Sequence, residues 1–187
     1  DLQFLKQWRK SGGIASLGKN SGGEAEKNFW RKIVFEVFEL SGGIDDFENY
    51  FEVVYEAFTR KDHWHVFEDV LGSRILSKLK GRGVTLGVVS NWDSRLHAIL
   101  KNTNLSGYFD FILASAQVGS AKPDKTIFFE ALRKSGVSSE EVCHIGDEPH
   151  ADVQGAKNAG IDAILIDRKG KYEKESITMV RSFLELV

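Results

Sequence analysis

The sequence predicts an α/β fold, a doubly wound parallel sheet with a helical region formed by the N-terminal third of the chain. Two observations lead to this prediction. Residues 1 to about 75 are rich in aromatic side chains at helical spacing, whereas from Ser73 onward short apolar runs alternate with helical segments. Strands that alternate with helices indicate right-handed βαβ units and therefore a parallel sheet. We expect the helical region to span residues 1–70 and the sheet domain residues 71–187.

The composition is that of a folded globular protein and excludes several classes of function. Of the 187 residues, 42% are hydrophobic and 28% are charged, and the formal net charge is −2. This balance provides no basic excess for nucleic-acid binding, and no apolar run approaches the roughly 20 residues that cross a bilayer. A single cysteine, Cys143, forms no internal disulfide, which favours a reducing compartment such as the cytoplasm. We therefore expect neither nucleic acid nor a membrane as a partner.

Two amphipathic helices are expected in the N-terminal third. Apolar side chains recur at three- and four-residue steps over residues 29–38 and again over residues 47–58. Ser41-Gly42-Gly43 ends the first helix, because glycine adopts the left-handed conformation that such an end requires. The Gly- and Ser-rich stretch 12–23 is expected to be a loop. Tandem helices with large apolar faces indicate a small helical bundle.

The sheet domain is expected to contain four strands separated by helices. The predicted strands are short and almost wholly apolar, as in strands buried on both faces: 84–89, 111–114, 142–145 and 163–166. The predicted helices of this domain are 74–80, 94–102, 125–135, 153–158 and a final amphipathic helix over 176–187.

Polar side chains follow these strands at their carboxyl ends, where doubly wound sheets carry their active sites. Ser90 and Asn91 follow the first strand, Lys122 lies in the loop after the second, and Asp147 and Asp152 follow the third. Carboxylates are ligands that Mg²⁺ takes together with phosphate oxygens, and a lysine supplies positive charge against a phosphoryl group. The set therefore suits an anionic substrate and a hard divalent cation.

These residues stand in three motifs that resemble the second, third and fourth motifs of the haloacid dehalogenase superfamily. The motifs are Val88-Val89-Ser90-Asn91, Ala121-Lys122-Pro123-Asp124, and the run that begins at Gly146-Asp147, contains Asp152 and ends at Ala159-Gly160. They occur in the family's order and at its usual separations, over roughly residues 64–170. The helical region before them is similar to the cap that many members insert after their first strand.

The resemblance implies a Rossmann-like core with a helical cap. It also implies a magnesium-dependent hydrolase, in the first place a phosphatase that acts on a small phosphorylated metabolite through an aspartyl-phosphate intermediate. Ser90 and Asn91 would bind the phosphoryl group, and Lys122 would neutralise its charge. Asp147 would ligate magnesium, and Asp152 would support the metal directly or through water.

The nucleophilic aspartate of that family belongs to an Asp-x-Asp motif after an apolar first strand, and no such motif stands in this sequence. Asp45-Asp46 has the wrong spacing and follows a Gly-Gly turn, and nothing precedes Asp1. The strand would be a central one, between the strands that end at Ser90 and Gly146. We therefore expect that an N-terminal segment with the nucleophile was cut, lies outside these 187 residues, or exists as a separate fragment.

Two other functions stay open. A 2-haloacid dehalogenase of the same superfamily attacks carbon without a metal, but the carboxylates of Asp147 and Asp152 make most sense around a cation. A catalytically inactive member that binds or regulates is supported by the missing nucleophile.

Four residues near the motifs are expected to have structural roles. Asp93 should cap the helix that follows it, His144 should pack in the core, Cys143 should be a small buried residue, and Asp167 should be structural.

Overall fold

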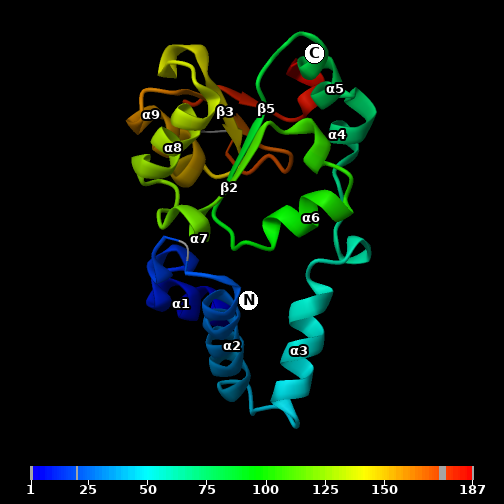
Figure 1. Ribbon diagram of the computed structural model, residues 1–187, viewed down its shortest axis with the longest axis vertical. Helices are drawn as coiled ribbons and strands as arrows, with labels where there is room; N and C mark the ends of the chain where they lie inside the picture. Colours follow the sequence, from blue (N-terminus) through cyan, green and yellow to red (C-terminus); the bar gives the residue numbers. More distant parts are fainter. Residues whose placement is uncertain (1, 20, 173–175, 187) are drawn as a thin grey trace. The chain divides into compact units, whose positions relative to one another are not determined.

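The computed structural model describes residues 2–19, 21–172 and 176–186 (Figure 1). Contacts divide the chain into two units. Unit 1 comprises residues 1–65, 90–106 and 114–120, and unit 2 comprises residues 66–89, 107–113 and 121–187. Each unit therefore combines segments that are distant in the sequence. The expected ranges 1–70 and 71–187 stay a prediction.

Unit 1 is helical. Its elements are α1 (Leu2–Ser11), η1 (Ile14–Leu17), α2 (Gly23–Glu39), α3 (Phe47–Ala57), η2 (Lys61–His63), α6 (Leu96–Asn102) and α7 (Ser115–Val118). The helices α2 and α3 are the two amphipathic helices that the aromatic spacing predicts. Their buried faces include Ile33 and Phe51, each 2% exposed, and burial of such a side chain contributes about 1.5–3 kcal/mol to stability. The stretch 12–23 is not wholly loop as predicted, because it contains η1, whose Ile14 is buried.

Unit 2 contains the strands with their helices. Its elements are α4 (Glu68–Ser73), α5 (Ile75–Gly81), β1 (Gly87–Ser90), η3 (Ser106–Tyr108), β2 (Phe111–Ala114), α8 (Lys125–Ser135), η4 (Ser139–Glu141), β3 (Cys143–Gly146), η5 (Pro149–Gln154), α9 (Gly155–Asn158), β4 (Asp162–Ile166), β5 (Met179–Val180) and η6 (Phe183–Leu186). The elements β1, β2 and η3 each have an end residue in unit 1. The alternation of strands and helices confirms the predicted α/β class.

The strands of the described residues form two sheets. β3, β4 and β5 form a parallel sheet in that order, with Cys143 opposite Asp162 and Leu165 opposite Met179. β1 and β2 form a second sheet of two strands. Within the described part of the chain, no strand pairs with both β1 and β3. The expectation of a further central strand between them stays a prediction.

Three sequence predictions in unit 2 are wrong. The final helix over residues 176–187 is absent from the described residues of that range, where β5 pairs with β4 and only the short turn η6 follows. The helical segment after β3 begins at Pro149 rather than at residue 153, and its first part has π-helical geometry. Cys143 is exposed rather than buried.

Asp167 follows β4 and has the structural role predicted for it. Its carboxylate accepts the backbone N–H groups of Lys171 at 3.0 Å and Tyr172 at 3.0 Å, which holds the turn after the strand.

Candidate active site

Lys122 and Asp152 form a buried ion pair in unit 2. The Lys122 Nζ donates to Asp152 Oδ1 at 2.5 Å and to the backbone carbonyl of Val89, in β1, at 2.9 Å. The two side chains are 12% and 4% exposed. A loop lysine is therefore fixed between the end of β1 and the helical segment that follows β3, as expected for groups at the carboxyl edge of the strands.

The Asp152 carboxylate has two further hydrogen-bond partners. His144 Nε2 lies 2.9 Å from Asp152 Oδ1, and the backbone N–H of Glu148 donates to Asp152 Oδ2 at 3.0 Å. The His144 ring stands edge-on to Phe128, with ring centroids 5.2 Å apart. His144 thus packs in the core as predicted, but it also holds the carboxylate that positions Lys122, which the sequence prediction missed.

Gly146 makes room for this carboxylate. A Cβ at residue 146 would lie 2.1 Å from the Cγ of Asp152, so any side chain there would displace the ion pair. Because side chains alternate along a strand, His144 shares the face of β3 on which Asp152 packs over Gly146. His144 lies two residues before Gly146 of the Gly-Asp motif. This spacing is the sequence signal that could have identified His144 as part of the site.

The network keeps Asp152 ionised. Burial alone would raise the pKa of this carboxyl, but the hydrogen bond from His144 and the charge and hydrogen bond of Lys122 hold the pKa well below its usual range. A buried ion pair with all of these partners is rigid, because displacement of either charge would leave the other uncompensated.

Asp147 is the carboxylate that fits a metal ligand. It follows β3 directly and its side chain is exposed, whereas the oxygens of Asp152 are occupied by Lys122, His144 and Glu148. The described residues contain no group of three His, Cys, Asp or Glu that could hold a metal. Mg²⁺ needs only one or two protein carboxylates when water and phosphate oxygens complete its shell. Asp147 therefore suits Mg²⁺ as a direct ligand, and Asp152 suits an indirect role.

The structure brings Lys122 and Asp152 together, with Asp147 one residue beyond β3, and all three belong to unit 2. Ser90 and Asn91 belong to unit 1. The turn that follows them is held by the Trp92 carbonyl, which accepts the Ala116 N–H at 3.1 Å.

Asp93 lies fully buried in unit 1. It accepts the backbone N–H of Arg95 at 2.9 Å in the turn before α6. Its predicted position as the helix cap is wrong, because the N-cap residue of α6 is Arg95. It also receives the Arg95 guanidinium, with Nη2 at 2.6 Å, and the indole N–H of Trp30 on α2. The aspartate thereby ties the loop before α6 to α2 within unit 1.

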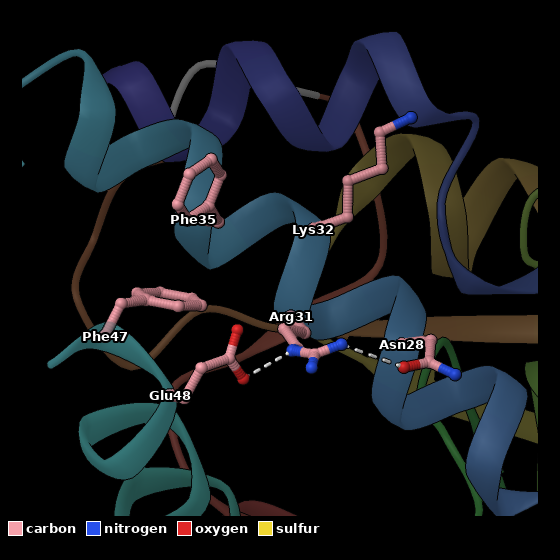
Figure 2. Close-up of a pocket in the computed structure, with 6 residues that line it drawn as sticks. All are labelled: Asn28, Arg31, Lys32, Phe35, Phe47 and Glu48. Atoms are coloured by element: carbon pink, nitrogen blue, oxygen red, sulfur yellow. Dashed lines mark hydrogen bonds and ion pairs between the residues drawn. The ribbon is translucent and has the colours of Figure 1, made fainter.

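Two hollows among the described residues of unit 1 differ in character. The first has a volume of about 490 Å³ and is lined by Phe4, Trp8, Trp30, Val34, Phe51, Val54, Tyr55, Phe58, Asn91, Trp92 and Arg95. The second, of about 360 Å³, lies between α2 and α3 (Figure 2). Figure 2 shows its exposed ion pair, in which Arg31 Nε lies 2.8 Å from Glu48 Oε2. Only the first hollow includes a residue of the motifs, Asn91.

None of the described helices is long and apolar enough to cross a membrane.

Comparison with known proteins gives a consistent family. A family model described as haloacid dehalogenase-like hydrolase matches residues 20–166. Haloacid dehalogenase-like hydrolase domain-containing protein 3 of Mus musculus is 36% identical over 149 residues, which cover 78% of this chain and 58% of the relative. A phosphoserine phosphatase of Thermus thermophilus is 30% identical over 141 residues, which cover 75% of this chain and 55% of the relative. The chain therefore spans somewhat more than half the length of these relatives.

A solved structure shows the same fold over nearly the whole chain. The crystal structure of a 2-haloacid dehalogenase from Pseudomonas syringae superposes with a TM-score of 0.68 at 25% identity, covering 98% of this chain and 76% of the other. The match of the fold, of the family model and of the relatives leads to one conclusion: this chain belongs to the haloacid dehalogenase-like hydrolase family.

Proposed function

We propose that this hydrolase is a magnesium-dependent phosphatase that acts on a small phosphate monoester through an aspartyl-phosphate intermediate. The observation that carries the proposal is the Lys122 ammonium, which is held by Asp152 at 2.5 Å and by the Val89 carbonyl at 2.9 Å. A fixed positive charge stabilises negative charge that develops on a transferring phosphoryl group without reorganisation during the reaction. The similarity to a phosphoserine phosphatase supports this reaction class.

Each site residue has a role in this proposal. Asp147 would hold magnesium, which when bound stabilises negative charge on phosphoryl oxygens. Lys122 would neutralise charge on the phosphoryl group, while Asp152 and His144 keep the ammonium in place. Ser90 and Asn91 would donate hydrogen bonds to phosphoryl oxygens. The attacking carboxylate would come from an aspartate on an N-terminal segment that is not among these 187 residues.

Dehalogenation is the second candidate, because the superposed structure is that of a 2-haloacid dehalogenase. That reaction would give no role to a cation at Asp147. The exposed Asp147 carboxylate beside Gly146 therefore favours the phosphatase.

The experiment that separates these functions compares two carboxylates in the natural full-length protein. Phosphate release from p-nitrophenyl phosphate and halide release from 2-chloropropionate are measured with magnesium and with EDTA. We expect phosphate release that needs magnesium and that Asp147→Asn lowers at least a hundredfold. Asp162→Asn is the matched control. Asp162 is also exposed, but it is the first residue of β4, whereas Asp147 follows the last residue of β3.

Three results would contradict the proposal. Phosphate release that is equal in EDTA would exclude the role of magnesium. Halide release without phosphate release would establish the dehalogenase. Absence of both activities from the full-length protein would favour the inactive, binding member of the family.

A further inference from the structure

The cavity of about 490 Å³ in unit 1 has walls made mainly of aromatic rings. Phe4, Trp8 and Trp30 stack on one another, with neighbouring ring centroids 5.2–6.4 Å apart. Phe58 and Trp92 stack at 6.0 Å. Such walls favour a flat apolar group, because ring faces gain from stacked and edge-to-face contacts beyond the burial of their area.

The charges in this wall compensate each other. The Arg95 guanidinium is paired with the fully buried Asp93, with Nη2 2.6 Å from Oδ2 and Nε 3.1 Å from Oδ1. Its plane lies over the Tyr55 ring, 3.9 Å from the centroid, and its Nη1 donates to the Tyr55 carbonyl at 3.2 Å. Burial raises the pKa of Tyr55 to about 12, so its phenol is uncharged at neutral pH. A charged ligand group would therefore find no uncompensated counter-charge among these residues.

The cavity extends to the loop that carries the Ser90-Asn91 motif, because Asn91 and Trp92 both line it. Trp92 directly follows Asn91, which lines the same cavity and is proposed to bind the phosphoryl group.

We propose that this cavity binds an uncharged aromatic group of the substrate through contacts with the aromatic rings of its wall. The identification of this group as the leaving group of a phosphate ester rests on the proposed function. The binding of a neutral aromatic compound does not, so it can be measured separately.

The hollow of Figure 2 offers no equivalent site. Four of its six lining residues are polar or charged, and its two phenylalanines, Phe35 and Phe47, contact each other edge-on at 5.1 Å. The chemistry that selects an aromatic ligand is therefore found in the first cavity.

Two neighbouring valines of α3 provide a matched test. Val54 lines the cavity, whereas Val53 is 60% exposed and does not. Val54→Phe should fill part of the cavity, and Val53→Phe should add the same bulk on the outside. In the full-length protein, binding of 2-naphthol is measured by calorimetry, and kcat/KM is measured for 2-naphthyl phosphate and glycerol phosphate.

We expect Val54→Phe to weaken 2-naphthol binding and to lower kcat/KM for 2-naphthyl phosphate at least tenfold more than kcat/KM for glycerol phosphate. Val53→Phe should change none of these. If 2-naphthol binds with this pattern but no ester is hydrolysed, the cavity proposal stands and the proposed function fails. Equal effects of the two substitutions, or a preference of the wild type for glycerol phosphate, would overturn the cavity proposal.

Trp92→Leu provides an independent test if Val54→Phe does not fold. It removes a ring that lines the cavity and stacks on Phe58. We expect it to weaken binding of 2-naphthol severalfold, and unchanged binding would overturn the cavity proposal.

Discussion

The two units use buried charge in different ways. In unit 2, Lys122 is held by Asp152 and a backbone carbonyl, and its partners are further polar groups such as His144. In unit 1, Arg95 is paired with Asp93 and covered by the rings of Tyr55, Phe58 and Trp30. In the proposed function, the first arrangement would hold an ammonium group beside an anion. The second would leave an aromatic surface whose charges are paired. Separate groups of residues would then control the reaction and the shape of the ligand.

The largest expected effect comes from Lys122→Met. Loss of the fixed charge should lower phosphate release by about 10²-fold or more. Removal of one partner of a buried pair should also destabilise the fold by about 3–5 kcal/mol, measured by urea unfolding. The double variant Lys122→Met/Asp152→Leu should regain most of the stability and none of the activity. Recovery of activity in the double variant would show that Lys122 acts only on the fold.

Gly146→Ala should have the next largest effect. The new Cβ would meet Asp152 Cγ at 2.1 Å, and such overpacking typically destabilises by about 1–3 kcal/mol. Gly81→Ala is the control, because a Cβ at residue 81 meets nothing within 4 Å. Thermal unfolding of both variants gives the comparison, and an equal shift in Tm would contradict the close packing of Asp152 on β3.

His144 should contribute less, because it acts on Asp152 rather than on substrate. His144→Phe removes a hydrogen bond of 2.9 Å, and we expect a loss of about 0.5–1.5 kcal/mol in stability. As a positioning residue it should lower kcat more than it raises KM. His144→Gln, which retains a donor, should recover part of kcat. Equal kcat for wild type and both variants would limit His144 to packing.

The smallest effect concerns stability in acid. The lowered pKa of Asp152 means that the folded state stabilises the carboxylate, so this contribution is complete above the ordinary carboxyl pKa of about 3.9 and is lost as the pH falls towards the lower, folded-state value. Asp152→Asn should flatten the dependence of unfolding free energy on pH below about 4. Urea titrations at several acidic pH values test this, and an unchanged slope would contradict the pairing with Lys122.

Much of the fold followed from local patterns. The predicted helix over residues 125–135 and the predicted strand over residues 111–114 have the same bounds as α8 and β2. In both segments the pattern of apolar residues agrees with the side chains that are buried. The proximity of Lys122 and Asp152 could be expected from the sequence. Each residue follows a predicted strand, and the carboxyl ends of parallel strands lie at the same edge of a sheet. The strand in the last segment could not be expected from the sequence, because the apolar spacing there also fits a helix. Met179–Val180 is a strand because it pairs with β4.

Other features depend on contacts that a linear sequence does not contain. Cys143 is exposed, although the apolar run around it predicts burial. The aromatic cavity requires α1, α2, α3 and the Asn91–Arg95 segment to meet. The predicted helical faces locate most of these rings, but they do not indicate that the rings surround a cavity.

The central claim, phosphoryl transfer through an aspartate outside the 187 residues, is tested most directly by intact mass. The natural active protein is quenched in acid during turnover of p-nitrophenyl phosphate and measured under denaturing conditions. The account predicts a longer chain or a co-purified fragment, with one phosphoryl group on an aspartate of that additional segment. Full phosphatase activity from a polypeptide with the mass of these 187 residues alone would contradict it.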